Sequence, residues 1–561
     1  MHKQQKIVQK TMAFIKLFEK SFRENFDHPA LSDYGTNVTY TYGVLAKEIA
    51  KLHILFKECD LKEGDKISLV GKNTSNWGIV HLATITYGAV IVPILQDFNL
   101  QDISHIIDHS DSVLLFCSNS IGEKIDKSKY SKIKAAFSLN DFRLIYQKEG
   151  EKIDRISSRL ESLLNEKCPG GFAPRHINYS DLPNESLAVL NYTSGTTGFS
   201  KGVMISGNNL LGNMEFAENT FHLKPGDNML SFLPLAHTYG IAFDFLYALS
   251  SGCHVTLLGK TPAPKILMQA FEDVKPNLII SVPLIFEKIY KKMIIPLLGK
   301  RPIKFALRIS ILDKRIYAKI RKKLVKAMGG IFDQVIIGGA ALNNEAEDFL
   351  LKIKFPVSVG YGMTECAPLI SFSLCKDYVP HSCGKILDCM QVRIDSEDPY
   401  NITGEIQVKG QNVMLGYYKN EEATRMVFTD DGWLKTGDLG TIDKNNNIFI
   451  RGRSKSMILG PNGQNIYPEE IESKLNNLPY VMESLVIEKN QKLTALVYPD
   501  NEAVEQTGIT PADLSAIMEQ NKETVNKLVA SYEKIAEIQL YPNEFEKTPK
   551  KSIKRFLYTV N

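Results

Sequence analysis

The hydrophobic pattern of residues 39–130 predicts three helices that alternate with three strands. The helices are expected over 42–58, 76–88 and 100–109, and the strands over 66–71, 89–95 and 112–117. These strands are apolar throughout instead of alternating with polar positions, so both of their faces should be covered. Helices and buried strands in alternation are typical of a parallel sheet with helices on both sides.

A second alternating series follows further along the chain. Its strands are predicted near 228–232, 254–258, 277–281, 334–338 and 356–360. Two such series predict two sheet-based subdomains within one large N-terminal body. Residues 4–20 carry apolar side chains at helical spacing, and a helix packed on that body is favoured there over a membrane anchor.

The pattern changes in the last third of the chain. From about Gly404 it predicts short β segments with turns, which indicate a small β-rich unit. The tail carries the apolar segments VMESLVIEK and LTALVYP, predicted as strands, and a predicted helix over 511–535. The fold class is therefore predicted as α/β, with a large N-terminal domain over 1–452 and a small α+β C-terminal domain over 453–561.

Composition narrows the class of protein. A chain of 561 residues is too long for one hydrophobic core, and 44% hydrophobic with 23% charged residues is ordinary for a soluble globular protein. The net charge of +4 does not argue for a nucleic-acid partner. The eight cysteines lack CxxC spacing and are expected to be reduced thiols. With no secretory signal and no apolar run of about 18 residues, we expect a cytoplasmic protein, at most peripheral to the inner face of a membrane.

One stretch has a strongly unequal charge. Residues 291–328 hold thirteen Lys or Arg residues against a single acid, Asp313, with apolar residues interleaved. A solvated helical face explains this pattern about as well as a function does. The functional alternatives are a dock for a membrane surface, or a landing site for an acidic partner such as a phosphate-rich cofactor or a carrier protein.

The segment LNYTSGTTGFSKGV, residues 190–203, has the composition of a phosphate-binding loop. Its hydroxyl groups, its glycines and Lys201 are what phosphate oxygens require, because glycine lets the backbone N–H groups come close. A Walker P-loop needs glycine before the lysine and Ser or Thr after it, whereas here Ser200 precedes Lys201 and Gly202 follows. A flexible linker is disfavoured because apolar runs flank the segment.

Two predicted strand ends offer residues that could line a pocket. His237 follows a strand in SFLPLAHTYG, although a single histidine is more often a packed or surface residue. A second strand, in VIIGGAALN, is followed by Gly338, Gly339, Ala340 and Ala341. Small side chains there would let a flat ring lie against the backbone, but packing of a helix on the strand explains the glycines almost as well.

Acidic and aromatic residues follow in three further motifs. In GYGMTE, Tyr361 could offer its ring to a base and Glu365 could hold Mg²⁺ against phosphate oxygens. In TGDLG, Asp438 could accept hydrogen bonds from both ribose hydroxyls. Taken alone, each carboxylate could equally be a solvated turn residue. Arg453 and Lys455, in GRSKS, lie at the expected domain boundary.

The order and spacing of these motifs resemble the adenylate-forming superfamily of acyl-CoA synthetases, nonribosomal-peptide adenylation domains and firefly-type luciferases. The resemblance covers about residues 25–556. YTSGTTGFSKG is similar to its phosphate loop, GYGMTE to its adenine and magnesium motif, TGDLG to its ribose motif and GRSKS to its hinge. The segment YGAVIVPI is similar to a structural motif of the same family.

The resemblance implies roles for individual residues. It places the ATP phosphates on Thr193, Ser194, Gly195, Thr196, Thr197, Gly198 and Lys201. It places adenine against Gly338, Gly339, Ala340, Ala341, Tyr361 and Gly362, and the ribose on Asp438 and Arg453. Glu365, in one motif with Thr364, would bind Mg²⁺ together with Thr193. His237 would lie at the carboxylate end of the acyl pocket, and Lys455 would be the pivot of a mobile C-terminal domain.

The same resemblance implies the chemistry. A carboxylate attacks the α-phosphorus of ATP, pyrophosphate leaves, and a thiol then displaces AMP to give a thioester. Positioning and charge stabilisation suffice for the first step. The implied cofactors are ATP, Mg²⁺ and coenzyme A, and the tail domain would rotate between the two half-reactions.

The chain departs from the family pattern near its end. The family places a lysine four residues after the threonine of a Lys-Thr pair, but here Lys547-Thr548 is followed at that position by Ser552. We expect Lys551 to substitute through a one-residue shift of the loop. The alternatives are Lys554 in that role, or slow adenylation.

The segment LGPNGQNIYPEEIE is one residue longer than the common hinge-loop form, which resembles the long-chain fatty-acyl-CoA synthetases. The histidine of LPLAHTYG points the same way. The expected function is activation of a medium- or long-chain fatty acid with coenzyme A as acceptor. The alternatives are transfer to the phosphopantetheine of an acyl carrier protein, and a non-catalytic nucleotide-binding relative.

Overall fold

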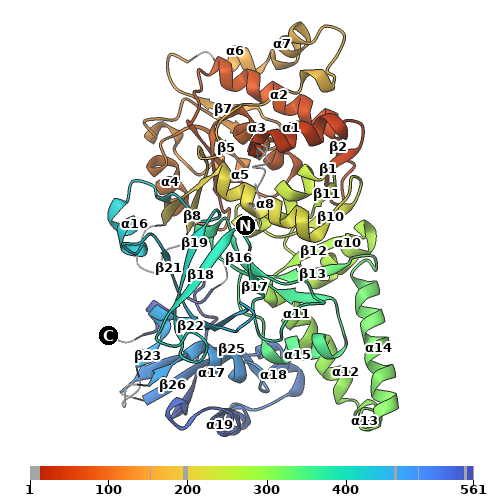
Figure 1. Cartoon of the computed structure of the whole chain (residues 1–561), viewed down its shortest axis with the longest axis vertical. Helices are drawn as coiled ribbons and strands as arrows, with labels where there is room; N and C mark the ends of the chain where they lie inside the picture. Colours follow the sequence, from red (N-terminus) through yellow and green to blue (C-terminus); the bar gives the residue numbers. More distant parts are fainter. Residues whose placement is uncertain are drawn as a thin grey trace, which may run out of the picture.

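An eight-stranded and a seven-stranded sheet carry most of the N-terminal part of the chain (Figure 1). The structure is a computed structural model, and it describes residues 13–151, 153–193, 200–459, 464–490, 492–548 and 552–559. Most neighbouring strands in both sheets run parallel, and helices lie between and around the sheets. This confirms the predicted α/β class.

The eight-stranded sheet has the order β20-β9-β8-β4-β3-β5-β6-β7. Its strands are β3 (Lys66–Val70), β4 (Val90–Ile94), β5 (Ser112–Cys117), β6 (Ala135–Ser138), β7 (Leu144–Gln147), β8 (Leu187–Thr193), β9 (Lys201–Ser206) and β20 (Gly416–Tyr417). The three predicted helices are α2 (Tyr42–Glu58), α3 (Ser75–Tyr87) and α4 (Leu100–His109). Each begins where the side chain of Thr41, Thr74 or Asn99 accepts a hydrogen bond from a backbone N–H of the first turn.

The seven-stranded sheet has the order β14-β13-β12-β10-β11-β1-β2. Its strands are β1 (Pro29–Asp33), β2 (Thr39–Thr41), β10 (Asn228–Ser231), β11 (His254–Leu257), β12 (Leu278–Ser281), β13 (Gln334–Ile337) and β14 (Val357–Val359). The five predicted strands are confirmed. β1 and β2 were not predicted, because β1 is a short mixed segment whose parallel partner β11 lies more than 200 residues further along the chain.

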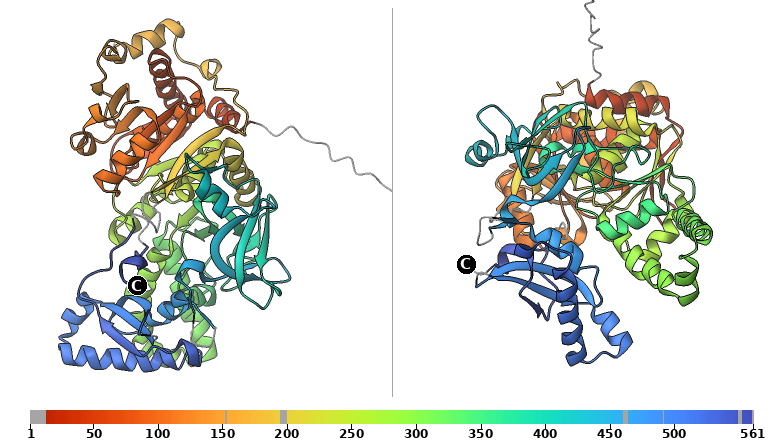
Figure 2. Two further views of the ribbon diagram at one scale, coloured as in Figure 1. Left: turned by 90° about the vertical axis from the view of Figure 1, so that its left-hand side faces the viewer. Right: turned by 60° about the horizontal axis from the view of Figure 1, so that its bottom comes forward.

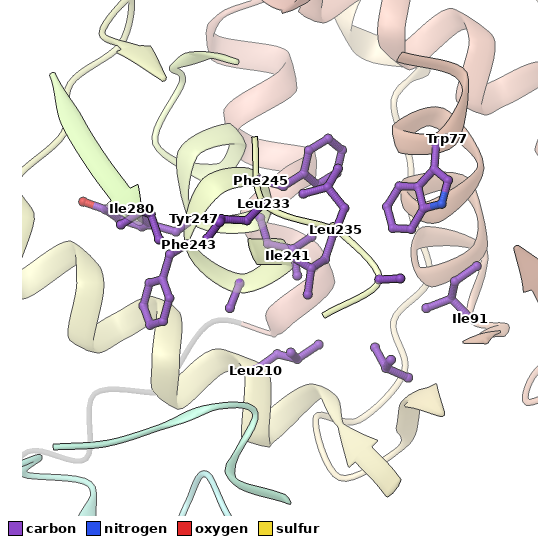
Figure 3. Close-up of a cluster of buried hydrophobic side chains, with 14 of the residues drawn as sticks. Trp77, Ile91, Leu210, Leu233, Leu235, Ile241, Phe243, Phe245, Tyr247 and Ile280 are labelled. Carbon is purple, nitrogen blue, oxygen red and sulfur yellow. The ribbon is translucent and has the colours of Figure 1, made fainter. Parts of the chain in front are cut away.

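Helix α3 lies in the core where the two sheets meet. Trp77 and Phe245 are fully buried there, and Phe245 belongs to the π-helix η3 (Gly240–Tyr247) of the second series (Figure 3). A Cβ at Gly78 would come within 2.7 Å of the Phe245 ring, so the close approach of α3 to η3 requires glycine at this position. The two predicted subdomains therefore share one continuous core.

Helix α1 (Phe14–Glu24) buries Phe14, Phe18 and Phe22 against the body. The amphipathic helix predicted from residue 4 is thus packed on the body over its described part, and residues 4–12 lie outside the described residues. The other α-helices of the N-terminal part are α5 (Asn119–Gly122), α6 (Ile153–Ser157), α7 (Leu160–Lys167), α8 (Gly207–Phe221), α9 (Ala248–Ser250), α10 (Pro264–Val274), α11 (Pro283–Ile289), α12 (Ile295–Gly299), α13 (Arg301–Ala306), α14 (Ser310–Ala327), α15 (Asn344–Lys352) and α16 (Glu421–Val427).

Two small antiparallel sheets follow, and they begin before Gly404, where the β-rich unit was predicted to start. One contains β15 (Tyr361–Gly362), β16 (Leu369–Phe372) and β17 (Lys385–Ile386). The other has the order β18-β19-β21-β22, with β18 (Met390–Asp395), β19 (Gly404–Gly410), β21 (Leu434–Ile442) and β22 (Ile448–Arg453). The extent of the N-terminal domain, 1–452, stays a prediction.

The C-terminal residues form a smaller unit with a hydrophobic core of its own, at one end of the molecule (Figure 2). Its elements are β23 (Ile458–Leu459), β24 (Asn465–Ile466), α17 (Pro468–Leu475), β25 (Val481–Lys489), β26 (Lys492–Pro499), α18 (Asn501–Thr507), α19 (Pro511–Asn526) and β27 (Glu537–Leu540). The helix predicted over 511–535 was too long. It ends at Asn526, whose side chain donates to the carbonyl of Ile535 and accepts from its N–H, so the chain folds back.

No helix among the described residues is long and apolar enough to span a membrane.

Candidate active site

The predicted ribose carboxylate lies beside the predicted adenine ring partner. The Tyr361 hydroxyl donates a hydrogen bond of 2.7 Å to Asp438 Oδ2, and Arg453 Nε lies 3.1 Å from Asp438 Oδ1. Asp438 on β21 and Arg453 on β22 are direct cross-strand partners, so the register of this hairpin sets the ion pair. Pairing between β21 and β22 could not be derived from either motif alone.

Burial raises the pKa of the Asp438 carboxyl, while the Arg453 guanidinium and the Tyr361 hydroxyl act against that rise. Asp438 is buried, whereas the Arg453 side chain is 69% exposed. The buried carboxylate is therefore fixed by the protein, and its exposed arginine partner can move toward a ligand.

A second cluster joins the phosphate loop to the predicted magnesium residue. Glu365 lies in the 3₁₀ turn η5 (Thr364–Cys366), and the Tyr417 hydroxyl donates to Glu365 Oε1 at 2.9 Å. On the other side of Tyr417, Lys201 Nζ lies 4.9 Å from the centre of its ring. Tyr417 therefore contacts one ammonium group through its ring and one carboxylate through its hydroxyl.

Sequence reasoning missed Tyr417. It lies on β20, a two-residue strand that pairs antiparallel with β9, the strand that Lys201 begins. A two-residue strand has no periodicity, so the only signal was a Tyr-Tyr pair after Gly416. Burial raises the pKa of the Tyr417 hydroxyl, which therefore stays a neutral donor to Glu365.

The two ends of the phosphate loop are held together by a β hairpin. Thr193 ends β8, Lys201 begins β9, and the two residues are cross-strand partners. The predicted phosphate ligands Ser194, Gly195, Thr196, Thr197 and Gly198 lie outside the described residues. The structure brings Thr193 and Lys201 together, at the two ends of this loop.

His237 lies in the loop between β10 and η3, half-buried. Its N–H donates to the carbonyl of Pro234, and its own carbonyl accepts from Ile241 N–H, each at 3.0 Å. Two asparagines hold the same loop, one on the eight-stranded sheet and one in the connection that follows β3. Asn191 on β8 donates to the carbonyl of Ala236 at 2.9 Å, and Asn73 donates to that of Leu233 at 2.7 Å. These asparagines position the loop, and the sequence did not single them out.

The glycines after β13 have two different explanations. A Cβ at Gly338 would lie 2.9 Å from the ring of Tyr239, whose hydroxyl donates to the carbonyl of Ile336. The ring that lies against Gly338 is therefore the protein's own. Gly339, Ala340 and Ala341 are exposed, and they leave the adjoining backbone accessible to a ligand.

Gly362 is also required by packing. A Cβ there would approach the carbonyl oxygen of Pro368 to 2.3 Å across the β15–β16 pair. The glycine lets this hairpin close, which in turn orients the Tyr361 side chain toward Asp438.

Lys455 lies in the 3₁₀ turn η6 (Ser454–Ser456), directly after β22, and is exposed. Other contacts hold the C-terminal unit against the body. Lys291 Nζ donates to the carbonyl of Asn476 at 2.5 Å, and Asn343 Nδ2 donates to Asn477 Oδ1 at 2.7 Å. Lys455 thus occupies the connection between two units that also touch through side chains.

The lysines near the C-terminus differ in their surroundings. Lys551 lies outside the described residues. Lys547 pairs with Glu483 at 2.6 Å, and Lys554 Nζ lies 3.5 Å from Glu546. Both described lysines are thus engaged with acids of their own unit.

The donor set of this site suits a phosphate-bound magnesium ion. Among the described residues, no group of three or more His, Cys, Asp or Glu side chains is placed to hold a metal. Mg²⁺ bound to nucleotide phosphates needs only one or two protein carboxylates, because phosphates and water fill its other positions. Glu365, whose carboxylate accepts from the Tyr417 hydroxyl, fits that requirement.

Comparisons with known proteins agree with the fold and the motifs. A long-chain-fatty-acid–CoA ligase of Mycobacterium bovis is 27% identical over 545 residues, which covers 88% of this chain and 86% of the relative. Long-chain-fatty-acid–CoA ligase 5 of Rattus norvegicus is 26% identical over 538 residues, with 87% and 75% covered.

The fold matches that of adenylate-forming enzymes. The crystal structure of ATP-bound MatB from Rhodopseudomonas palustris superposes with a TM-score of 0.75, at 22% identity, covering 97% of this chain and 98% of that one. The match confirms a large N-terminal domain with a small C-terminal domain. The family model described as AMP-binding enzyme matches residues 18–418, and the chain accordingly belongs to the AMP-binding enzyme family.

Proposed function

We propose that the protein is an AMP-forming acid–thiol ligase, which activates a carboxylic acid with ATP and transfers the acyl group to coenzyme A. The observation that carries this proposal is the arrangement of Lys201, Tyr417 and Glu365 near the end of the β8–β9 hairpin where the phosphate loop joins the two strands. This arrangement supports a site in which the triphosphate would meet the Lys201 ammonium group and the Glu365 carboxylate, both held in contact with Tyr417.

The nucleoside would bind next to Asp438. Its carboxylate would accept hydrogen bonds from the ribose hydroxyls once the exposed Arg453 side chain turns toward the ligand. The exposed residues 339–341 would offer their backbone to adenine, and Tyr361, which is buried beside Asp438, remains the proposed ring partner. Family membership and the ATP-bound structural neighbour support this placement.

Adenylation in this site is a matter of positioning and charge. The loop that carries His237, fixed by Asn73 and Asn191, would hold the acid so that its carboxylate oxygen attacks the α-phosphorus in line with the leaving pyrophosphate. Lys201 offsets negative charge on the departing phosphates. Glu365, with Thr193 as a further ligand, would hold Mg²⁺, which would supply Lewis-acid stabilisation of the phosphate oxygens.

Thioester formation completes the reaction. The thiolate sulfur of coenzyme A attacks the acyl carbonyl carbon, the carbon–oxygen bond to AMP breaks, and AMP leaves with the bonding electron pair. We propose that the C-terminal unit, residues 453–561, turns about Lys455 between the two steps. We also propose Lys551 as the cation that stabilises the adenylation transition state.

The acid is proposed to be a fatty acid of medium or long chain. The two curated relatives described above are named long-chain-fatty-acid–CoA ligases, which supports this choice. A luciferin 4-monooxygenase of Photuris pensylvanica is 26% identical over 472 residues, so identity at this level does not select the substrate. An acyl carrier protein is the alternative acceptor, and a cytoplasmic location remains the expectation.

Pyrophosphate release tests the proposal. Purified protein is supplied with ATP, Mg²⁺ and single acids from acetate to palmitate, together with aryl acids, and pyrophosphate is measured without and with coenzyme A. We expect release with medium- or long-chain acids and acyl-CoA only when coenzyme A is present. A parallel reaction with an acyl carrier protein separates the two acceptors. If none of the tested acids causes pyrophosphate release, that result would contradict an active ligase and favour the non-catalytic alternative.

A further inference from the structure

Helices α12, α13 and α14, residues 295–327, form a helical segment that we term the basic arm. The arm lies at the edge of the molecule, with α14 along that edge and α13 at its far end (Figures 1 and 2). It contains eleven Lys or Arg residues and one acid, Asp313. Such a surface is strongly positive in a chain whose total net charge is only +4.

The cations just before the arm have a structural role. Lys291 donates to the carbonyl of Asn476, and Lys292 lies 2.8 Å from Glu502, so both contact the C-terminal unit. The eleven cations of the arm differ from them. All eleven are exposed, and within the described part of the chain none forms an ion pair. The basic stretch predicted over 291–328 is therefore two features, a domain contact followed by an unpaired cationic surface.

The cations of α14 lie on the side that faces away from the protein. Ile320 and Leu324 are buried against the body, and the Tyr317 ring lies 6.4 Å from that of Phe349. At about 100° per residue, the seven cations fall within an arc of roughly 200° on the other side. They are Lys314, Arg315, Lys319, Arg321, Lys322, Lys323 and Lys326. The 18 residues of α14 make this face ~27 Å long.

Large apolar side chains are exposed in residues 293–312, the segment that leads into this cationic face. Phe305 is 68% exposed and Met293 60% exposed. Ile295, Ile309 and Leu312 are exposed as well. Apolar side chains of this size are normally buried, and several of them close together in an exposed segment indicate a surface that contacts an apolar partner.

We propose that the basic arm docks the protein on an anionic lipid surface. Lys and Arg residues would meet the negative headgroups along α14, while Phe305, Ile309 and Leu312 enter the boundary between headgroups and acyl chains. Charge complementarity would also suit an acidic protein. The lipid surface is favoured because one extended face combines seven cations with bulky apolar side chains at its end, and an acidic protein surface would leave those side chains exposed to water.

This inference does not rest on the proposed ligase activity, and its test reads binding alone. The purified full chain is mixed with vesicles of phosphatidylcholine, or of phosphatidylcholine with phosphatidylglycerol, and the bound fraction is measured by sedimentation. We expect binding only to the anionic vesicles, and weaker binding at 0.5 M salt. The double substitution Lys319→Glu and Lys322→Glu should lower the vesicle partition coefficient at least about tenfold.

A matched control changes the same net charge elsewhere. Lys124 and Lys444 are exposed and lie outside the arm, so Lys124→Glu with Lys444→Glu should leave vesicle binding within about twofold of the unaltered protein. A further variant, Phe305→Trp, reports insertion, because its fluorescence should shift to shorter wavelength with anionic vesicles. Circular dichroism of each variant verifies folding.

Two results would overturn the proposal. One is equal vesicle binding by the arm variant and the control variant, since the arm would then have no special part. The other is arm-dependent binding of an acidic protein, such as an acyl carrier protein, without binding of anionic vesicles. That second result would identify the basic arm as a protein-docking surface.

Discussion

The Tyr417 hydroxyl offers the sharpest test of the candidate site. Tyr417→Phe removes the donor that lies 2.9 Å from Glu365 Oε1 and keeps the ring that lies 4.9 Å from Lys201 Nζ. If Glu365 binds the magnesium ion of the nucleotide, it then loses the partner that fixes its carboxylate. Lys201 keeps its contact, so the substitution separates the two halves of the cluster.

The size of the effect follows from the kind of hydrogen bond. A hydrogen bond to a charged group contributes about 1.5–3 kcal/mol, which corresponds to roughly a tenfold to hundredfold change in rate if that orientation matters in the transition state. Stability should change less. Glu365 is only half-buried, so water can replace the lost donor and the free energy of unfolding should fall by about 1 kcal/mol or less.

The assay is pyrophosphate release as a function of Mg²⁺ concentration, with the best acid found. Tyr417→Phe should lower the adenylation rate at least about tenfold and raise the Mg²⁺ concentration needed for half of the maximal rate. The next residue provides the control. The Tyr418 hydroxyl also donates to a carboxylate at 2.9 Å, Asp111 Oδ2, away from the Glu365 cluster, so Tyr418→Phe should leave both quantities unchanged.

The reasoning is refuted if Tyr417→Phe shows the unaltered rate and Mg²⁺ requirement. It is refuted as well if Tyr418→Phe lowers activity to the same extent, because the effect would then come from general disturbance of the β20 region.

Three further predictions address the tail domain, the missing lysine and the core. Asn477→Ala removes the hydrogen bond to Asn343 and should change the rates of adenylation and thioester formation in opposite directions. Single-turnover kinetics measures both rates, and a fall in both of them would contradict a domain rotation. Lys551→Ala should slow acyl-AMP formation about a hundredfold, and Lys554→Ala should slow it much less. An unchanged rate in Lys551→Ala would show that Lys551 does not take the role of the lysine expected at Ser552. Burial lowers the pKa of His81 to about 3, so the unfolded chain binds a proton below about pH 6.5 that the folded chain does not. Between pH 7 and pH 5, the unfolding free energy of the unaltered protein should therefore fall by about 2 kcal/mol more than that of His81→Leu. Denaturant titration of both proteins at the two pH values measures this difference.

Local sequence patterns were sufficient for most of the regular elements. Helix α2 has the predicted bounds, and the strands of both parallel series lie within a residue or two of their predictions. The reason is that a strand buried on both faces must be apolar throughout, and that Thr41, Thr74 and Asn99 cap the three predicted helices of the first series. The predicted helix over 511–535 failed because its end depends on Asn526 bonding to Ile535, a contact that no periodicity encodes.

The sequence by itself determined the α/β class, the motif order and the chemical character of the site residues, because composition and spacing act through the local chain. Only the tertiary structure decided which of them meet. It paired Asp438 with Arg453 through the register of β21 and β22, brought Tyr417 into contact with both Lys201 and Glu365, and laid Tyr239 against Gly338. Each of these contacts joins segments that are far apart or separated by a turn. Their geometry depends on how sheets pair and pack, and a one-dimensional pattern does not contain that information.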